Sequence, residues 1–281
     1  MKFKHFARAF APIVGIALAA AVAGCDKATI TLNGEEGKKL ADLDLSGKAP
    51  DELVVAGPDE VQLTQGDKLA ITVDGDPDAV DKLRFTLKDG SLGILREGKL
   101  FQKDGTKIAV VHVTMPAPRD MVMAGSGKIV AAALAPQAKV TVAGSGTVEA
   151  GNVGGESLDL NIAGSGSFRG AGNVKSLDMT VAGSGSASMA ALKTDKAKVT
   201  IAGSGDTTFA SDGDVEATIM GSGSVTVKGR ARCKVSSMGS GSLICEGPVE
   251  TMSDDEEKAT PPTPPTPPTP PTPPTPPTPA A

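Results

Sequence analysis

The sequence is poor in the residue types that most often carry catalysis or ligate metals. Its 281 residues include no Trp, no Tyr and two His. Polysaccharide-cleaving enzymes often hold sugars on aromatic side chains between opposed carboxylates, so the lack of Trp and Tyr argues against that class. His5 falls in a terminal export signal, which leaves His112 alone in an apolar stretch. A lone His with three Cys fits no zinc spacing, so we expect no catalytic residue, metal site or cofactor.

A basic surface is also lacking. The net charge is −5 and is spread along the chain, which excludes the positive stripe that nucleic acid requires. Carboxylate pairs such as Asp76 with Asp78, and Asp212 with Asp214, lie in expected turns, where Asp is favoured for its own backbone hydrogen bonds. Only Asp206 borders a Gly-Ser-Gly turn, so we expect no ladder of calcium sites.

The amino terminus has the pattern of an export signal. Residues 1–24 combine a basic head with an apolar run that is too short for a confident membrane span. The four residues Val22-Ala23-Gly24-Cys25 resemble the bacterial lipobox, in which Cys25 is acylated after cleavage. That resemblance implies a membrane anchor through Cys25, while the choice between inner and outer membrane stays open. An ordinary signal peptide that happens to carry a cysteine is the alternative.

The carboxyl terminus, residues 251–281, is expected to lie outside the fold. An acidic run, Asp254 to Glu257, precedes a Thr-Pro-Pro repeat from Thr260 to Pro279. Proline fixes φ and removes the backbone donor, so this segment predicts an extended polyproline II spacer.

The centre of the chain is organised by a repeated phrase, Gly-Ser-Gly. Seven copies recur at steps of 18 to 20 residues, and this period is long enough for two strands and two turns. Because glycine accepts tight corners and close backbone approach, the copies predict structural turns. Their first glycines are Gly125, Gly144, Gly164, Gly183, Gly203, Gly221 and Gly239.

Apolar residues alternate on both sides of each phrase, which predicts two strands per repeat. Stacked coils would pair every strand with the coil above and below, so we predict an all-β fold, a parallel β-solenoid with coils of about 19 residues. It is expected over residues 43–250, irregular in 43–120 and regular in 121–250, after a tether in 25–42. One helical turn is expected after Pro77, over residues 78–82.

The serial Gly-Ser-Gly turns behind a lipobox resemble the bacterial head GIN domain, also described as an autotransporter adhesin head. The resemblance covers residues 43–250. It implies a right-handed β-helix and an adhesive or surface role, and it supplies no catalytic residues.

Two cysteines fall at inward positions of the last repeat. Cys233 lies six residues before Gly239 and Cys245 lies six residues after it, so the two face each other across one coil. In an exported protein they could form a disulfide, and two buried free thiols are the alternative.

The function expected from these observations is that of a non-enzymatic lipoprotein of the cell envelope. Its outward residues would bind an unknown protein or polysaccharide, or would simply be solvated. A scaffold that self-associates, and a pectate-lyase-like enzyme acting on polysaccharide, are the competing hypotheses.

Overall fold

The computed structural model describes residues 31–32, 34–97 and 107–251. The export signal, Cys25 and the proline-rich tail lie outside the described residues. Within the described part, no helix is both long and apolar enough to cross a bilayer.

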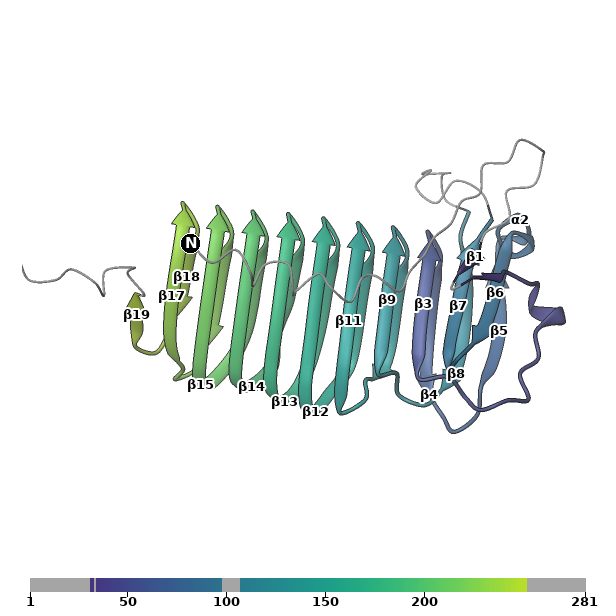
Figure 1. Cartoon of the computed structure of the whole chain (residues 1–281), viewed down its shortest axis with the longest axis horizontal. Coiled ribbons are helices and arrows are strands. Elements are labelled where there is room, and N and C mark those ends of the chain that lie inside the picture. Colours follow the sequence, from purple (N-terminus) through teal and green to yellow (C-terminus); the bar gives the residue numbers. More distant parts are fainter. Residues whose placement is uncertain (1–30, 33, 98–106, 252–281) are drawn as a thin grey trace, which may run out of the picture.

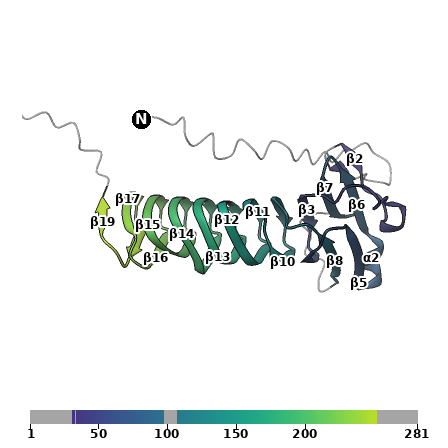
Figure 2. The ribbon, with the colours of Figure 1, turned by 90° about the horizontal axis from the view of Figure 1, so that it is seen from below.

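The fold is a parallel β-solenoid whose two main faces we call sheet I and sheet II (Figures 1 and 2). In the regular coils a short third stretch lies between them, where residues 153–155 pair with residues 172–174. Four long strands bend around the rod and contribute to both sheets: β12 (Thr147–Gly164), β13 (Ser167–Gly183), β14 (Ser186–Gly203) and β15 (Asp206–Gly221). Sheet I contains their carboxyl-terminal parts together with β7 (Ser91–Arg96), β3 (Glu52–Gly57), β9 (Asp120–Gly125), β11 (Gln137–Gly144), β17 (Arg232–Gly239) and β19 (Val249–Thr251). Sheet II contains their amino-terminal parts together with β8 (Ala109–Met115), β4 (Glu60–Gln65), β10 (Lys128–Ala133), β16 (Ser224–Lys228) and β18 (Ser242–Cys245).

The core lies between the two sheets and is formed by the alternate residues that the sequence predicted as inward. Val142, Ile162, Val181 and Ile201 form one row in sheet I, each at most 1% exposed. Val148 and Phe168 belong to the facing row in sheet II and are fully buried. Since the period of a strand is two residues, every coil places its apolar set on the same inner face.

Each Gly-Ser-Gly phrase forms a corner that stacks directly on the corner of the previous coil. Gly183 has φ +118°, and a Cβ atom added there would lie 2.5 Å from the carbonyl oxygen of Gly164. That same oxygen accepts a hydrogen bond from the N–H of Ser184 at 2.9 Å. The second glycine, Gly185, is also excluded from carrying a side chain, because its Cβ would lie 2.4 Å from the side chain of Ile162. Only the middle residue has room for a side chain, and the serine there is exposed.

The coils do not stack in chain order at the amino-terminal end. Strand β3 lies between β7 and β9, so the second coil of the chain, β7 with β8, is outermost (Figure 1). Two antiparallel strands then cover this coil: β6 (Leu83–Lys88) pairs with β7, and β5 (Ala70–Gly75) pairs with β8. The predicted helical turn is α2 (Pro77–Asp81), between β5 and β6. Residues 43–120 therefore contain two coils and a cap.

Part of the expected tether lies against the cap. It contains β1 (Thr31–Leu32), β2 (Glu35–Glu36) and the short 3₁₀ helix η3 (Leu40–Asp42). Lys38 exchanges two backbone hydrogen bonds with Phe85 of β6, at 2.9 and 2.7 Å, and Leu40 packs against the core. Within the described part of 25–42, the segment from Lys38 onward thus belongs to the folded body.

A corner glycine should be far less replaceable than a glycine elsewhere in the regular coils. We predict that Gly183→Ala lowers the free energy of unfolding by about 2–4 kcal/mol, because the new Cβ meets a backbone oxygen at a positive φ. Gly154→Ala is the matched control, since its nearest new contacts are at 3.6 and 3.9 Å. It should change stability by less than about 1 kcal/mol. Urea unfolding measures both, and equal losses would contradict the role of the corner.

Candidate functional site

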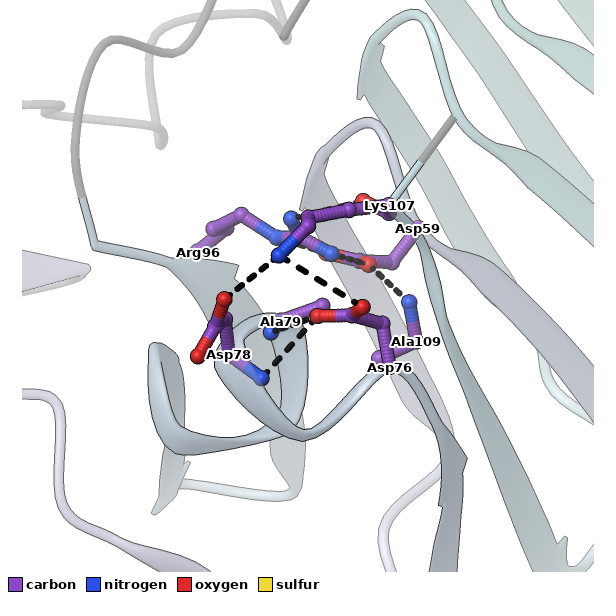
Figure 3. Close-up of polar contacts among 7 residues, drawn as sticks. All are labelled: Asp59, Asp76, Asp78, Ala79, Arg96, Lys107 and Ala109. Atoms are coloured by element: carbon purple, nitrogen blue, oxygen red, sulfur yellow. Dashed lines mark hydrogen bonds and ion pairs between the residues drawn. The ribbon is translucent and has the colours of Figure 1, made fainter. Parts of the chain in front are cut away.

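A buried ion pair centred on Asp59 joins the outermost coil to the coil beside it (Figure 3). The Asp59 side chain is 3% exposed and forms an ion pair with Arg96, whose Nε donates to Oδ2 at 2.8 Å. The backbone N–H of Ala109 donates to Oδ1 of the same carboxylate, also at 2.8 Å. Because Arg96 ends β7 and Ala109 begins β8, this carboxylate fastens the outermost coil to the next one.

Asp59 occupies a corner that differs from the other corners. Gly57 pairs with Gly125, so Gly57-Pro58-Asp59 stands in register with the first Gly-Ser-Gly phrase. Asp59 therefore takes the place of the second glycine, where regular corners have no room for a side chain. Arg96, the last residue of β7, reaches the carboxylate at this corner. No motif in the sequence marks this pair, whose members are 37 residues apart.

Two further carboxylates lie beside this ion pair and are also satisfied. Asp76 caps α2 by accepting hydrogen bonds from the backbone N–H groups of Asp78 and Ala79. Lys107 Nζ lies 2.5 Å from Asp78 and 3.7 Å from Asp76. The hydrogen bond to Asp78, followed by the charges of Asp76 and Asp78, raises the pKa of Lys107, and the pKa of Asp78 is lowered by the same contact.

This arrangement is suited to holding structure together. Its two buried or capping carboxylates, Asp59 and Asp76, already accept protein donors, and Arg96 donates to the carbonyl oxygen of Lys107 at 3.1 Å as well. Among the described residues, no group of three or more His, Cys, Asp or Glu side chains is placed to hold a metal ion.

His112 lies on the outward side of β8, opposite Thr72 of β5. Its Nε2 lies 3.4 Å from Asp74, and its side chain is 42% exposed. The sequence offered no acidic partner within the segment of His112, and the antiparallel strand β5 supplies one. A cross-strand pair of this kind is typical of the solvent side of a sheet.

The expectation that Asp212 and Asp214 lie in a turn is wrong, because both lie within β15, and both form ion pairs with the neighbouring coil. Asp212 lies 2.5 Å from Lys193, and Asp214 lies 2.9 Å from Arg232. Asp206 accepts hydrogen bonds from Ser224, at 2.5 Å from the hydroxyl and 3.2 Å from the N–H. These contacts run along the rod axis, each from one coil to the next.

The outward side of sheet II near the corners is rich in hydroxyl groups. Thr147 and Ser167 lie 3.0 Å apart through their side-chain oxygens on adjacent coils. Glu149 lies between Lys128 at 3.0 Å and Arg169 at 3.1 Å, and the hydrogen bond from Lys128 contributes most to lowering its pKa. One outward row, which we call the hydroxyl row, contains five hydroxyl residues, Thr147, Ser167, Ser186, Ser224 and Ser242, with the carboxylate of Asp206 between Ser186 and Ser224. It runs beside the exposed corner serines Ser126, Ser145, Ser165, Ser184, Ser204, Ser222 and Ser240.

The outward side of sheet I carries a row of charges instead. Asp159 and Asp178 are direct neighbours in this row, flanked by Lys139 and Lys198. Partial burial, and then the adjacent Asp159 carboxylate, raise the pKa of Asp178. Each position of the coil thus repeats along the rod at about 4.8 Å, the spacing of neighbouring strands.

The two inward cysteines form a disulfide in the structure. Cys233 of β17 and Cys245 of β18 have Cα atoms 6.6 Å apart and join the two sheets within the last coil. The seven predicted corner glycines all have positive φ. Cys25, the predicted lipidation site, lies outside the described residues.

Comparison with known proteins identifies the class. The profile of the family described as "Putative auto-transporter adhesin, head GIN domain" matches residues 49–231, and the chain belongs to this family. The solved structure of a protein from Parabacteroides distasonis, described as a putative lipid binding protein, is similar with a TM-score of 0.55 and 21% identity. That match covers 73% of this chain and 94% of the other. A Bacteroides fragilis structure, described as a putative adhesin, gives a TM-score of 0.53 at 16% identity, covering 73% of this chain and 93% of the other. A search of curated proteins found no match.

Loss of the arginine partner of Asp59 should be much more costly than loss of a surface arginine. We predict that Arg96→Met lowers the free energy of unfolding by about 3–5 kcal/mol, because it leaves a buried carboxylate without its cation. The control is Arg232→Met, which breaks an exposed ion pair and should cost at most about 1 kcal/mol.

Urea unfolding of both variants measures the difference. Adding Asp59→Asn to Arg96→Met should recover part of the loss, since the uncompensated charge is then removed. Similar losses for the two single arginine variants would contradict the account of the cluster.

Proposed function

We propose that this protein is a non-enzymatic binding or adhesion module of the bacterial cell envelope, held at a membrane through acylated Cys25. Family membership supports an adhesin-like, exported protein. The lipobox pattern supports the anchor, and the length of the rod supports a role that extends away from the membrane.

The observation that carries the proposal is the repetition of outward side chains along the rod. The hydroxyl row and the exposed corner serines recur once per coil, so one contact geometry is offered many times in a line. Individually weak contacts gain strength when they are made together. Such a surface suits a repetitive partner, either a polysaccharide or another β-sheet.

Enzymatic action on polysaccharide has less support. The carboxylates Asp59, Asp76 and Asp78 near the cap, and Asp212 and Asp214 in β15, are bound to Arg, Lys or backbone N–H groups. Opposed, free carboxylates are what glycoside cleavage requires.

One structural neighbour is described as a putative lipid binding protein. In this chain the space between the sheets is occupied by its own side chains, such as Phe168 and Phe209, so a lipid would have to bind on the outside.

A periplasmic scaffold is the second candidate, and exposure at the cell surface separates it from an adhesin. We expect a membrane-impermeant maleimide to label Ser184→Cys on intact cells as fully as on permeabilised cells, because this corner serine is exposed. Labelling is preferable to protease shaving here, since a backbone paired on both sides resists cleavage.

Two controls accompany this experiment. Val181→Cys, at a fully buried position of the same coil, should stay unlabelled in the folded protein. A known periplasmic protein should be labelled only after permeabilisation. If Ser184→Cys behaves like that periplasmic protein, the surface-adhesin proposal fails and the scaffold replaces it.

A further inference from the structure

The first and last described strands lie at opposite ends of the rod (Figure 2). Strand β1 pairs with β2, and Glu35 of β2 forms an ion pair at 2.9 Å with Lys88 of β6, at the end that we call the capped end. Strand β19 pairs with β17 at the far end. Ten strand pairings lead from β6 to β19 through sheet I. At about 4.8 Å for each pairing, the two ends are about 48 Å apart.

The predicted lipidation site is close in sequence to the capped end. Six peptide steps separate Cys25 from Thr31, the first residue of β1. A fully extended chain covers at most about 22 Å over six steps, which is less than half the length of the rod. An acyl group on Cys25 therefore holds the capped end near lipid, and the far end lies beyond its reach.

The sides of the described rod carry little that would hold them against lipid. The large apolar side chains that are exposed in the described part lie at the two ends: Ile108 in the cap, and Met238, Ile244 and Val249 in the last coils. On the sides, basic residues share their rows with carboxylates. The net charge of −5 also disfavours contact with anionic lipids. The far end could meet lipid only if the rod lay flat on one of these sides.

We propose that the solenoid stands on the membrane by its capped end, so that the coils from β14 to β18 are the part presented to a partner. This inference rests on the acylation of Cys25 in the proposed function. It gives the two halves of the hydroxyl row different roles. The half from Ser186 to Ser242 lies far from lipid and can be reached by a large partner, whereas the half nearer the cap lies closer to the headgroups.

The test measures energy transfer from the protein to a lipid plane. The full acylated chain is placed in vesicles that contain acceptor-labelled lipid, with a donor dye on one new cysteine, because Cys233 and Cys245 are joined to each other. The labelled variants are Thr72→Cys on β5, Ser186→Cys on β14 and Ser242→Cys on β18. All three positions are exposed and lie on the outward side of sheet II.

The distance to the lipid plane should increase in the order of residues 72, 186 and 242. Nine strand pairings separate β5 from β18 through sheet II, or about 43 Å, so the first and last positions should differ by more than about 25 Å even in a tilted rod. Equal distances at the three positions would mean that the rod lies flat, and a shortest distance at residue 242 would mean that it is inverted. Either result would overturn the proposal.

Two controls separate the orientation from the anchor. The variant Cys25→Ser should give no transfer from any of the three positions, and mass spectrometry of the unsubstituted chain should find acyl groups on Cys25. If that chain carries no acyl group and gives no transfer, the anchor in the proposed function fails and the orientation fails with it. If Cys25 is acylated and the three distances are equal, the anchor stands and the orientation alone is wrong.

Discussion

The stacking of each corner on the previous one is the constraint on which the rest of the structure depends. A glycine carbonyl such as that of Gly164 receives the N–H of the next coil's serine, and a Cβ at Gly183 would occupy the same space. This contact aligns neighbouring coils residue by residue, without a register shift near the corner. Because the register is fixed there, inward positions stay inward and outward rows stay straight over the regular coils. The binding surface that we propose is a consequence of this alignment.

The outermost coil, β7 with β8, is joined to its neighbour by side chains. This coil lacks a Gly-Ser-Gly corner, and Asp59 with Arg96 makes the connection that backbone contact makes elsewhere. A buried ion pair tolerates substitution poorly, because removal of either partner leaves the other one buried and uncompensated. The opposite end carries no comparable cover in the described chain. Its disulfide joins the two sheets of the last coil.

The parts of the fold that could be predicted from the sequence are those that repeat. Seven glycine corners and the alternation around them were sufficient to predict two strands per coil, the buried rows and the facing positions of Cys233 and Cys245. The position of β3 between β7 and β9 could not be predicted, because each strand alone shows the same alternation wherever it stacks. Asp59 and Arg96 were missed for a related reason, since their contact is long-range and occurs once. Asp74 beside His112 likewise depends on the antiparallel pairing of β5.

The most direct test of in-register stacking is a distance between the first and last corners. Spin labels on Ser126→Cys and Ser240→Cys, in a chain with Cys25→Ser diluted by unlabelled protein, report this distance by double electron–electron resonance. Both serines are exposed at corners, and six coil steps of about 4.8 Å separate them. The account predicts a narrow distribution centred near about 29 Å. A broad distribution, or a centre beyond about 40 Å, would contradict direct stacking of the corners.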